Sequence, residues 1–153
     1  MRDLKSLTHA DARQIVDLIL ASTAGDGGKA LTVCVSDVFG EPLILERHDG
    51  ASGRTVKLAM AKSRQAAVTG QATAYVAHDE LPSGEWQLKA VNAHRKDDNL
   101  RTENPSYLSL AGGCPVTVDG LTVGGVGVSG RAQLDDHAIG TAAATAWAAS
   151  LRS

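Results

Sequence analysis

Residues 116–123 read Val116-Thr117-Val118-Asp119-Gly120-Leu121-Thr122-Val123, two alternating runs on either side of an Asp-Gly pair. Alternation of apolar and polar residues is typical of a half-buried strand, and Asp-Gly is a strong signal for a two-residue hairpin turn. The segment therefore predicts a β-hairpin whose second arm continues through Gly124 to Ser129. Strands joined by a hairpin are antiparallel, so we expect an antiparallel sheet around them.

Two further strands are expected upstream of this hairpin. Alternating residues predict one strand over 30–36 and a second over 43–46, joined by a turn that contains Gly40 and Pro42. Residues 81–107 have no clean period and form a long excursion, with a short strand near 86–91. The two strands upstream again predict an antiparallel pair.

Three main helices are expected around the strands. Apolar residues at helical spacing predict a helix over 8–23 and a second over 55–68, and an alanine-rich helix begins at Asp135 or Asp136 and runs to Leu151. A short further helix is expected over 73–78. The inner side of the second helix is expected to carry Val56, Ala59, Met60, Ser63, Ala66 and Ala67. With hairpins between the strands, the helices are expected to form a separate layer.

The composition limits what the chain can do. Its 153 residues predict one domain over 1–153, and 24 alanines with 16 glycines leave about a quarter of the side chains no larger than a methyl group. A net charge of −2 provides no general field for nucleic acid, and five scattered aromatic residues make a poor surface for base stacking. We therefore expect no nucleic-acid partner, and backbones that pack closely within or between subunits.

The N-terminal residues and the cysteines bear on the compartment. The start of the chain, Met1 to Ser6, is charged and polar and lacks the apolar core of a signal peptide, and no apolar run is long enough to span a membrane. Cys34 and Cys114 lie 80 residues apart and do not form a disulfide framework. We expect a cytoplasmic protein with free thiols and no membrane partner.

A glycine motif in the C-terminal third is not expected to bind a dinucleotide. Residues 125–130 match the pattern G-x-G-x-x-G after a strand and before a helix. Only 23 residues follow Gly130, too few for the helix, parallel strand and ribose-binding acid that the fingerprint requires. A glycine-rich strand that a helix approaches closely is the preferred interpretation.

The segment from Glu46 to Ala51 is the densest polar cluster beside a strand end. Arg47 is a candidate to bind a carboxylate through two parallel hydrogen bonds, and His48 or Asp49 is a candidate to move a proton. The alternative is an Arg–Asp pair that only holds the loop. Both interpretations stay open at the level of sequence.

Lys62 interrupts a helix face of small residues. Helical spacing brings Ala59 and Ala66 near it, so a partly desolvated lysine with a lowered pKa is one interpretation, suited to proton donation or anion binding. The alternative is a surface lysine whose ammonium group reaches water.

Gly112 and Gly113 precede Cys114 and are candidates to bind a ligand. Backbone amides after paired glycines can form an anion-binding nest and lower the pKa of a thiol, and the alternative is a small residue entering a strand. None of the five histidines has the spacing of a zinc site, so no metal is expected.

The order of these motifs resembles the GlcG/HbpS-like family over nearly the whole chain, apart from the central excursion. The runs that carry the resemblance are Val35-Ser36-Asp37-Val38-Phe39-Gly40, Leu45-Glu46-Arg47-His48-Asp49-Gly50-Ala51, Ala61-Lys62, Gly112-Gly113-Cys114-Pro115-Val116, Asp119-Gly120, Gly124-Gly125-Val126-Gly127-Val128-Ser129-Gly130 and Asp135-Asp136. The C-terminal domain of PduO-type corrinoid adenosyltransferases is similar as well.

The resemblance implies an α+β, profilin-like fold, an antiparallel sheet with helices packed on its faces, and a homo-oligomer. Haem binding or haem degradation is the usual label of the family, which makes haem a candidate cofactor. Arg47, Asp49 and Lys62 match recurring polar positions of the family, as do the paired glycines. His48 and Cys114 depart from the family's pattern and place reactive side chains beside motif positions.

Three functions are therefore expected in order of preference. The first is a protein that binds haem or another planar or carboxylated small molecule, with Arg47, Gly112, Gly113 and Cys114 as ligand-binding candidates. The second is a cofactor-independent isomerase, lyase or hydrolase on a small carboxylate, with Lys62, His48 and Asp49 as catalytic candidates. The third is an accessory subunit without a ligand. A large ligand is expected to need walls from a neighbouring subunit, because aromatic residues are few.

Overall fold

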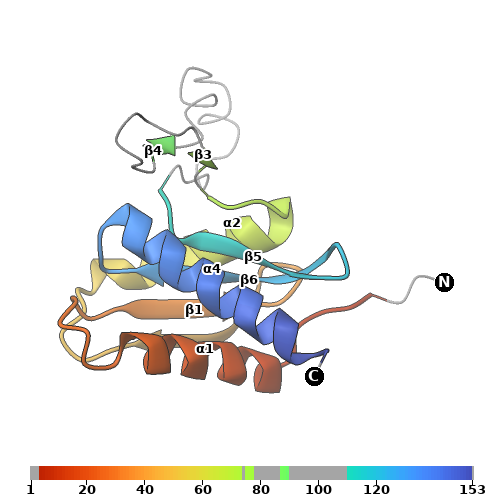
Figure 1. Cartoon of the computed structure of the whole chain (residues 1–153), viewed down its shortest axis with the longest axis horizontal. Coiled ribbons are helices and arrows are strands. Elements are labelled where there is room, and N and C mark those ends of the chain that lie inside the picture. The colour runs from red at the N-terminus through yellow and green to blue at the C-terminus, as the bar shows by residue number, and fades with distance from the viewer. Residues whose placement is uncertain (1–3, 74, 78–86, 90–109, 153) are drawn as a thin grey trace.

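A computed structural model describes residues 4–73, 75–77, 87–89 and 110–152 (Figure 1). The chain contains three helices and six strands in these residues. They are α1 (His9–Thr23), β1 (Thr32–Ser36), β2 (Pro42–Arg47), α2 (Arg54–Thr69), β3 (Tyr75–Ala77), β4 (Gln87–Lys89), β5 (Gly113–Val118), β6 (Leu121–Ser129) and α4 (Gln133–Ser150).

Four strands form one antiparallel sheet in the order β2-β1-β6-β5. The predicted hairpin is confirmed, since β5 and β6 pair with Val118 opposite Leu121. The first two strands also pair antiparallel, with Val33 opposite Glu46. β3 and β4 form a separate two-stranded antiparallel sheet.

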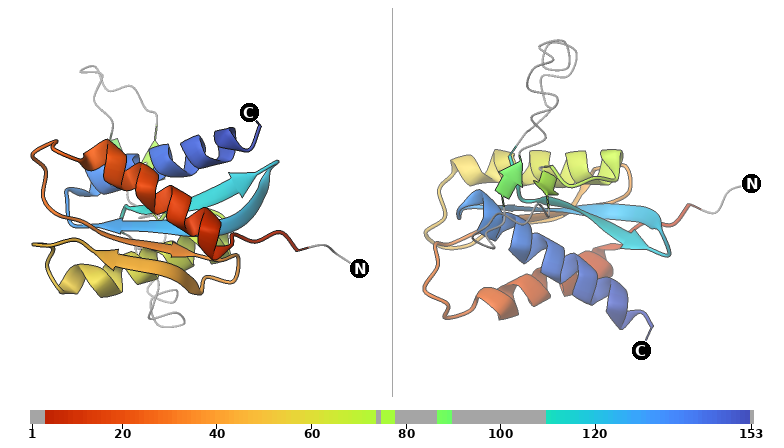
Figure 2. Two further views of the ribbon diagram at one scale, coloured as in Figure 1. Left: turned by 90° about the horizontal axis from the view of Figure 1, so that it is seen from below. Right: turned by 45° about the horizontal axis from the view of Figure 1, so that its top comes forward.

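The helices cover both faces of the four-stranded sheet. α2 packs on β6, β1 and β5, whereas α1 and α4 pack on each other and on the opposite face (Figure 2). The domain is therefore a three-layer α+β arrangement, as expected for an antiparallel sheet with helices on its faces.

The main hydrophobic core lies between the sheet and the α1–α4 layer. Thr8 is the N-cap of α1, and its side chain and the Asp11 carboxylate form a capping box. Capping fixes the start of the helix, so that its apolar stripe faces the sheet. The largest fully buried apolar side chains of this core are Ile15, Val16, Ile19, Leu31, Val33, Val35, Val116, Val126 and Val128.

The interface between α2 and the sheet is built from small residues. A Cβ added at Gly125 would meet the Ser63 carbonyl oxygen, and one added at Gly127 would meet the Ala59 carbonyl oxygen. The helix backbone therefore lies directly on β6. The interpretation of residues 125–130 as a glycine-rich strand that a helix approaches closely is therefore confirmed.

The beginning of the outer strand β5 has little free backbone at its exposed edge. The Gly113 N–H donates to Thr73 Oγ1 at 2.9 Å, and the Gly113 carbonyl accepts from the Thr73 N–H at 3.0 Å. Pro115 follows in the same strand and has no N–H. The other outer strand, β2, begins at Pro42.

Several predicted details are corrected. Residues 75–77 form a strand and not part of a helix over 73–78, because they pair with 87–89. Met60 is 38% exposed and does not lie on the inner side of α2, where Lys62 and Thr55 are buried instead. α4 begins at Gln133, two residues before Asp135. The predicted strand near 86–91 is confirmed as β4, and the rest of the excursion over 81–107 lies outside the described residues.

Candidate functional site

Lys62 is the most deeply buried cation in the described part of the chain. It is 2% exposed, and its Nζ donates to the Val128 carbonyl oxygen at 2.9 Å and approaches Asp136 Oδ2 at 3.4 Å. Lys62 belongs to α2 and Asp136 to the first turn of α4, so the pair joins the helix layers on the two sides of the sheet. The interpretation as a surface lysine is wrong, and the desolvated lysine is confirmed.

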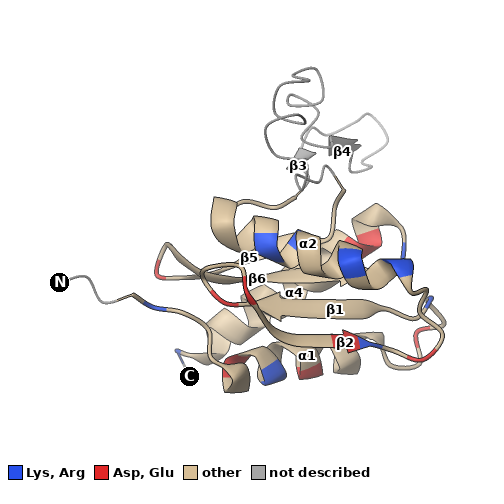
Figure 3. Ribbon diagram, turned by 180° about the vertical axis from the view of Figure 1, so that it is seen from behind, with Lys and Arg blue, Asp and Glu red and all other residues tan. Residues whose placement is uncertain are grey.

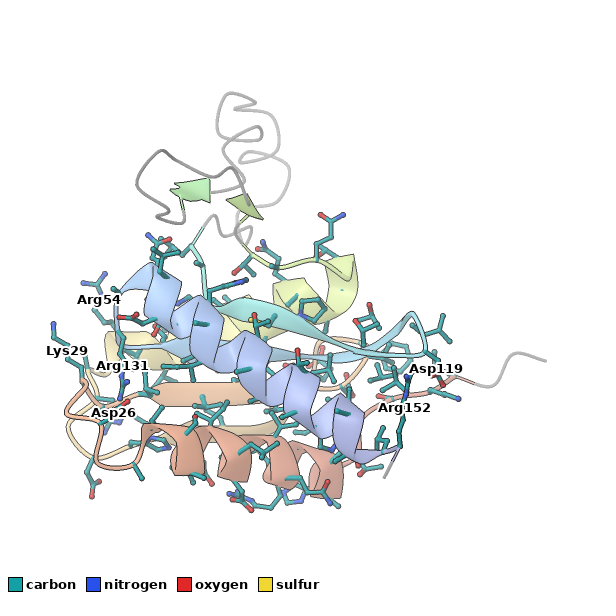
Figure 4. The ribbon with its side chains drawn as sticks, viewed as in Figure 1. Asp26, Lys29, Arg54, Asp119, Arg131 and Arg152 are labelled. Carbon is teal, nitrogen blue, oxygen red and sulfur yellow. The ribbon has the colours of Figure 1, made fainter. Side chains whose placement is uncertain are left out.

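Asp136 is held in place by the loop before α4. Its Oδ1 accepts from the Arg131 N–H at 3.0 Å, and its position in the first helical turn is favourable for a negative charge. The Arg131 guanidinium binds both oxygens of Asp26, at 2.6 and 2.9 Å, and donates from Nε to the Lys29 carbonyl (Figure 4). Arg131 thus joins the loop before α4 to Asp136 through its backbone and to Asp26 and Lys29 through its side chain.

Burial disfavours both charges of the Lys62–Asp136 pair. Desolvation lowers the pKa of Lys62, and the negative charge of Asp136 opposes that shift. Desolvation likewise raises the pKa of Asp136, and the positive charge of Lys62 opposes it. The opposite charge of each residue favours the ionised form of the other, and a substitution that removes one residue leaves the other buried without a partner.

Gly112 makes room for this pair. Its φ is +121°, and a Cβ at this position would lie 2.9 Å from Lys62 Nζ and would also meet the Val128 carbonyl oxygen. The Gly113 N–H already donates to Thr73, and the Ala111 N–H donates to Gln133 Oε1 at 3.1 Å. The two glycines therefore shape the space around Lys62. The backbone amides of Ala111 and Gly113 already have hydrogen-bond partners within the protein.

Cys114 lies beside the same pair. Its Sγ is 3.2 Å from Thr141 Oγ1 and 3.6 Å from the His137 carbonyl oxygen. Burial raises the pKa of this thiol to about 11, although Thr141 and the charge of Lys62 act in the opposite direction. A thiol of this kind is protonated at neutral pH and is not an activated nucleophile.

His137 is a half-buried residue of this cluster that the sequence analysis did not select. Its Nε2 is 3.4 Å from Thr141 Oγ1, whereas its Nδ1 is buried without a hydrogen-bond partner. Burial lowers the pKa of His137. It lies in α4, and its contact with Cys114 of β5 depends on the packing of two segments that are distant in the sequence.

Arg47, His48 and Asp49 form a second group at the end of β2. Arg47 and Asp49 are exposed, and no hydrogen bond or ion pair joins them to each other in the described residues. His48 is half-buried, and its Nε2 is 3.9 Å from Glu46 Oε2 without a hydrogen bond. No hydrogen bond or ion pair between described residues joins this group to Lys62, so the predicted residues fall into two sets.

The described residues contain no group of three or more His, Cys, Asp or Glu side chains that could hold a metal ion. Within the same ranges, no helix is both long and apolar enough to cross a membrane.

The family model described as "Haem degrading protein HbpS-like" matches residues 7–145. Comparison with curated proteins gave no match.

Several solved structures are similar over almost the whole chain. Protein ORFY of Klebsiella pneumoniae, from family DUF336, has a TM-score of 0.78 at 23% identity and covers 97% of this chain and 95% of its own. A double mutant of HbpS from Streptomyces reticuli has a TM-score of 0.74 at 26% identity, over 99% and 90% of the two chains. A complex described as PduOC with heme has a TM-score of 0.67 at 21% identity, over 93% and 94%.

Proposed function

Because the chain belongs to the HbpS-like family, we propose that it is a small-molecule-binding protein with haem as its first candidate ligand. The description of the family model and the haem complex of the PduOC domain support this proposal. The observation that carries it in this chain is a buried imidazole nitrogen without a hydrogen-bond partner, at His48 Nε2.

The residues around His48 fit a haem group. A neutral imidazole nitrogen is a common ligand of haem iron, and the adjacent Arg47 is exposed and has no ion-pair partner among the described residues. In this proposal His48 holds the iron and Arg47 binds a propionate through charge-assisted hydrogen bonds. Bound there, haem would supply an iron centre able to take a further ligand.

A second copy of the chain is part of this proposal. Haem is large and planar, and Arg47 is the last residue of the outer strand β2, with His48 directly after it. A neighbouring subunit would supply the remaining apolar walls. We therefore propose a homo-oligomer, in line with the expectation drawn from the small number of aromatic residues.

Titration of haemin into the purified full-length protein tests the ligand. The wild type is expected to give a saturable shift of the Soret band near one haem per chain, and His9→Ala, an exposed histidine at the start of α1, serves as the matched control. His48→Ala is expected to lose the shift and Arg47→Met to weaken it. Absence of a saturable shift in the wild type would overturn haem as the ligand. Loss in His137→Ala with retention in His48→Ala would overturn the assignment to His48.

A second candidate function is proton transfer on a small carboxylate, and the buried Lys62 beside Asp136 favours it. A desolvated lysine with a lowered pKa is suited to acid–base work near neutral pH. Lys62 would exchange the proton. Arg47 lies in the separate group at the end of β2, so a carboxylate bound by Arg47 would have His48 or Asp49 as the proton carrier.

Deuterium exchange into an enolisable keto acid such as oxaloacetate, followed by NMR, tests this second candidate. The wild type is expected to accelerate the exchange above the buffer rate, and Lys62→Met to abolish the acceleration. If the wild type gives only the buffer rate, or Lys62→Met retains full exchange, the role of Lys62 as a proton carrier is wrong.

A further inference from the structure

Basic side chains gather at the end of the sheet where β2 ends and α2 begins. Figure 3 shows them on both elements, and Figure 4 places Arg54 and Lys29 at the same end of the domain, beside Arg131. Arg47 is the last residue of β2, and Arg54 is the first residue of α2. Lys29 lies in the segment before β1. Three segments that are separate in the sequence thus contribute one exposed cation each, namely Lys29, Arg47 and Arg54.

Contacts between these segments hold the two arginines close together. Thr55 Oγ1 is 2.6 Å from Thr32 Oγ1, and Thr32 is the register partner of Arg47 in the sheet. The Arg47 side chain reaches the start of α2, because a Cβ built at Gly53 would lie 3.5 Å from Arg47 Nη1. Arg54 follows Gly53 directly. The fold therefore brings Arg47 to the start of the helix that carries Arg54.

The three cations have no ion-pair partner among the described residues, although carboxylates lie nearby. Asp26 pairs with Arg131, and Glu46 pairs with Arg13. Asp49 is an exposed residue of the turn after β2, and the first turn of α2 contains no acidic residue. Cations near each other repel, and an anionic ligand relieves that repulsion. This surface is therefore suited to a ligand with more than one negative charge.

His48 adds an unpartnered ring nitrogen to the same end of the sheet. Its backbone N–H donates to the Leu31 carbonyl oxygen at 2.9 Å, which sets the turn after β2 beside the segment that contains Lys29. The His48 side chain is 23% exposed, and its Nε2 is buried without a hydrogen-bond partner. A planar ligand held at His48 would thus have the cations next to its edge.

We propose that Arg47 and Arg54 bind the two carboxylates of one ligand, and that Lys29 adds to the positive charge that attracts it. An arginine binds a carboxylate through two parallel hydrogen bonds, so two neighbouring arginines match two carboxylates. A porphyrin with two free propionates carries such a pair at one edge. This inference rests on the proposed ligand class, and it adds that the carboxylates hold the ring even in the absence of iron.

Iron-free protoporphyrin IX and its dimethyl ester test the inference separately from iron binding. Neither ring offers iron to His48, and only the free acid carries two negative charges. In a titration of the full-length protein followed by porphyrin fluorescence, the free acid is expected to bind saturably, near one ring per chain. The dimethyl ester is expected to bind about tenfold or more weakly, because it cannot form the charge-assisted hydrogen bonds.

The variant Arg54→Met removes one charge and keeps an apolar side chain. It is expected to bind the free acid about tenfold more weakly, and Arg54→Lys is expected to recover part of the loss, since it keeps the charge without the planar fork. The wild type and Arg54→Met are expected to bind the dimethyl ester equally, which a general loss of structure would not produce. Arg152→Met, at an exposed arginine of the opposite end (Figure 4), is the matched control and is expected to bind both rings like the wild type.

Two results would overturn the carboxylate site even if haemin gives its Soret shift. They are equal binding of the free acid and the ester by the wild type, and equal affinities of the wild type and Arg54→Met for the free acid. Conversely, binding of the free acid with the expected loss in Arg54→Met, but without a Soret shift for haemin, would support the carboxylate site and overturn iron ligation by His48.

Calorimetry with succinate distinguishes a porphyrin from a short dicarboxylate as the source of the two carboxylates. The wild type is expected to bind succinate weakly or not at all, because succinate has no ring to contact the turn. Binding of succinate that Arg54→Met loses, together with no binding of protoporphyrin, would overturn the porphyrin as the ligand of these arginines.

Discussion

The sequence predicted that Lys62 is partly desolvated, but it did not predict the ion-pair partner of Lys62. Helical spacing places it among small residues, and this predicted partial desolvation. Its partner, Asp136, lies 74 residues further along the chain, on a helix of the opposite layer. No local pattern connects the two, so the ion pair at the centre of the site emerged only from the fold.

Removal of either charge of this pair is expected to destabilise the protein. Lys62→Met leaves a buried carboxylate and Asp136→Asn leaves a buried ammonium group, and each change is expected to cost about 3–5 kcal/mol of the free energy of unfolding. The double variant is expected to lose much less than the sum of the two. Urea denaturation of all four proteins gives the coupling energy, and strict additivity would contradict a direct interaction.

Cys114 is expected to make the protein less stable at alkaline pH. Its pKa in the folded state is about 11 against an ordinary value of 9.0, so between these values the native state binds more protons than the unfolded state. Stability therefore falls as the pH rises through this interval, by up to about 3 kcal/mol once the thiol has ionised.

The variant Cys114→Ser removes this titration and keeps a polar atom next to Thr141. Comparison of urea midpoints of the wild type and the variant from pH 8 upward isolates the contribution of the thiol. Parallel pH profiles for the two proteins would show that the thiol does not contribute.

At the scale of elements, the contact between α2 and β6 depends on glycines. Gly127→Ala would push the new Cβ against the Ala59 carbonyl oxygen, and we expect a loss of about 1–3 kcal/mol or more. Gly53→Ala is the control, because a Cβ there would meet only Arg47 Nη1 at 3.5 Å, and its effect is expected to stay below about 1 kcal/mol. Equal thermal midpoints for the two variants would contradict the close approach of helix and strand.

Elements with local signals were predictable. Thr8 marked the start of α1, Gly70 ends α2 in a left-handed conformation, and Asp119-Gly120 fixed the hairpin. The short strand β3 was mistaken for a helix because its three residues are defined by pairing with β4, and such pairing leaves no periodic signal in a short segment. The prediction that Met60 lies on the inner side of α2 is wrong for a different reason. The exposure of Met60 depends on the exact rotation of α2 on the sheet.

At the scale of the whole molecule, one sheet is shared by both helix layers. We therefore expect cooperative two-state unfolding, in which neither layer is lost alone. Trp147 is a buried reporter of the α1–α4 layer, and its Nε1 donates to Gln14 Oε1 at 3.1 Å. In a Trp86→Phe background, its fluorescence and the far-UV circular dichroism are expected to change at the same urea concentration. A separate, earlier fluorescence transition would show that the layers unfold independently.

The candidate site was predictable only in part at this scale. Lys62, Gly112, Gly113 and Cys114 were selected individually, and the fold brings them together. The other candidates, Arg47, His48 and Asp49, lie in a separate group. Their position in a sequence motif did not determine which helices and strands pack against each other. His137 and Thr141 join the first group because α4 packs on β5, where both residues contact Cys114.

The prolines of the two outer strands have a consequence for aggregation. A sheet with bare outer edges invites strands of other molecules to extend it, which is a route to insoluble fibres. Here β2 begins at Pro42, and in β5 Thr73 occupies the backbone groups of Gly113 just before Pro115. Each edge thus carries a local block to the addition of another strand, at Pro42 of β2 and at Gly113 to Pro115 of β5.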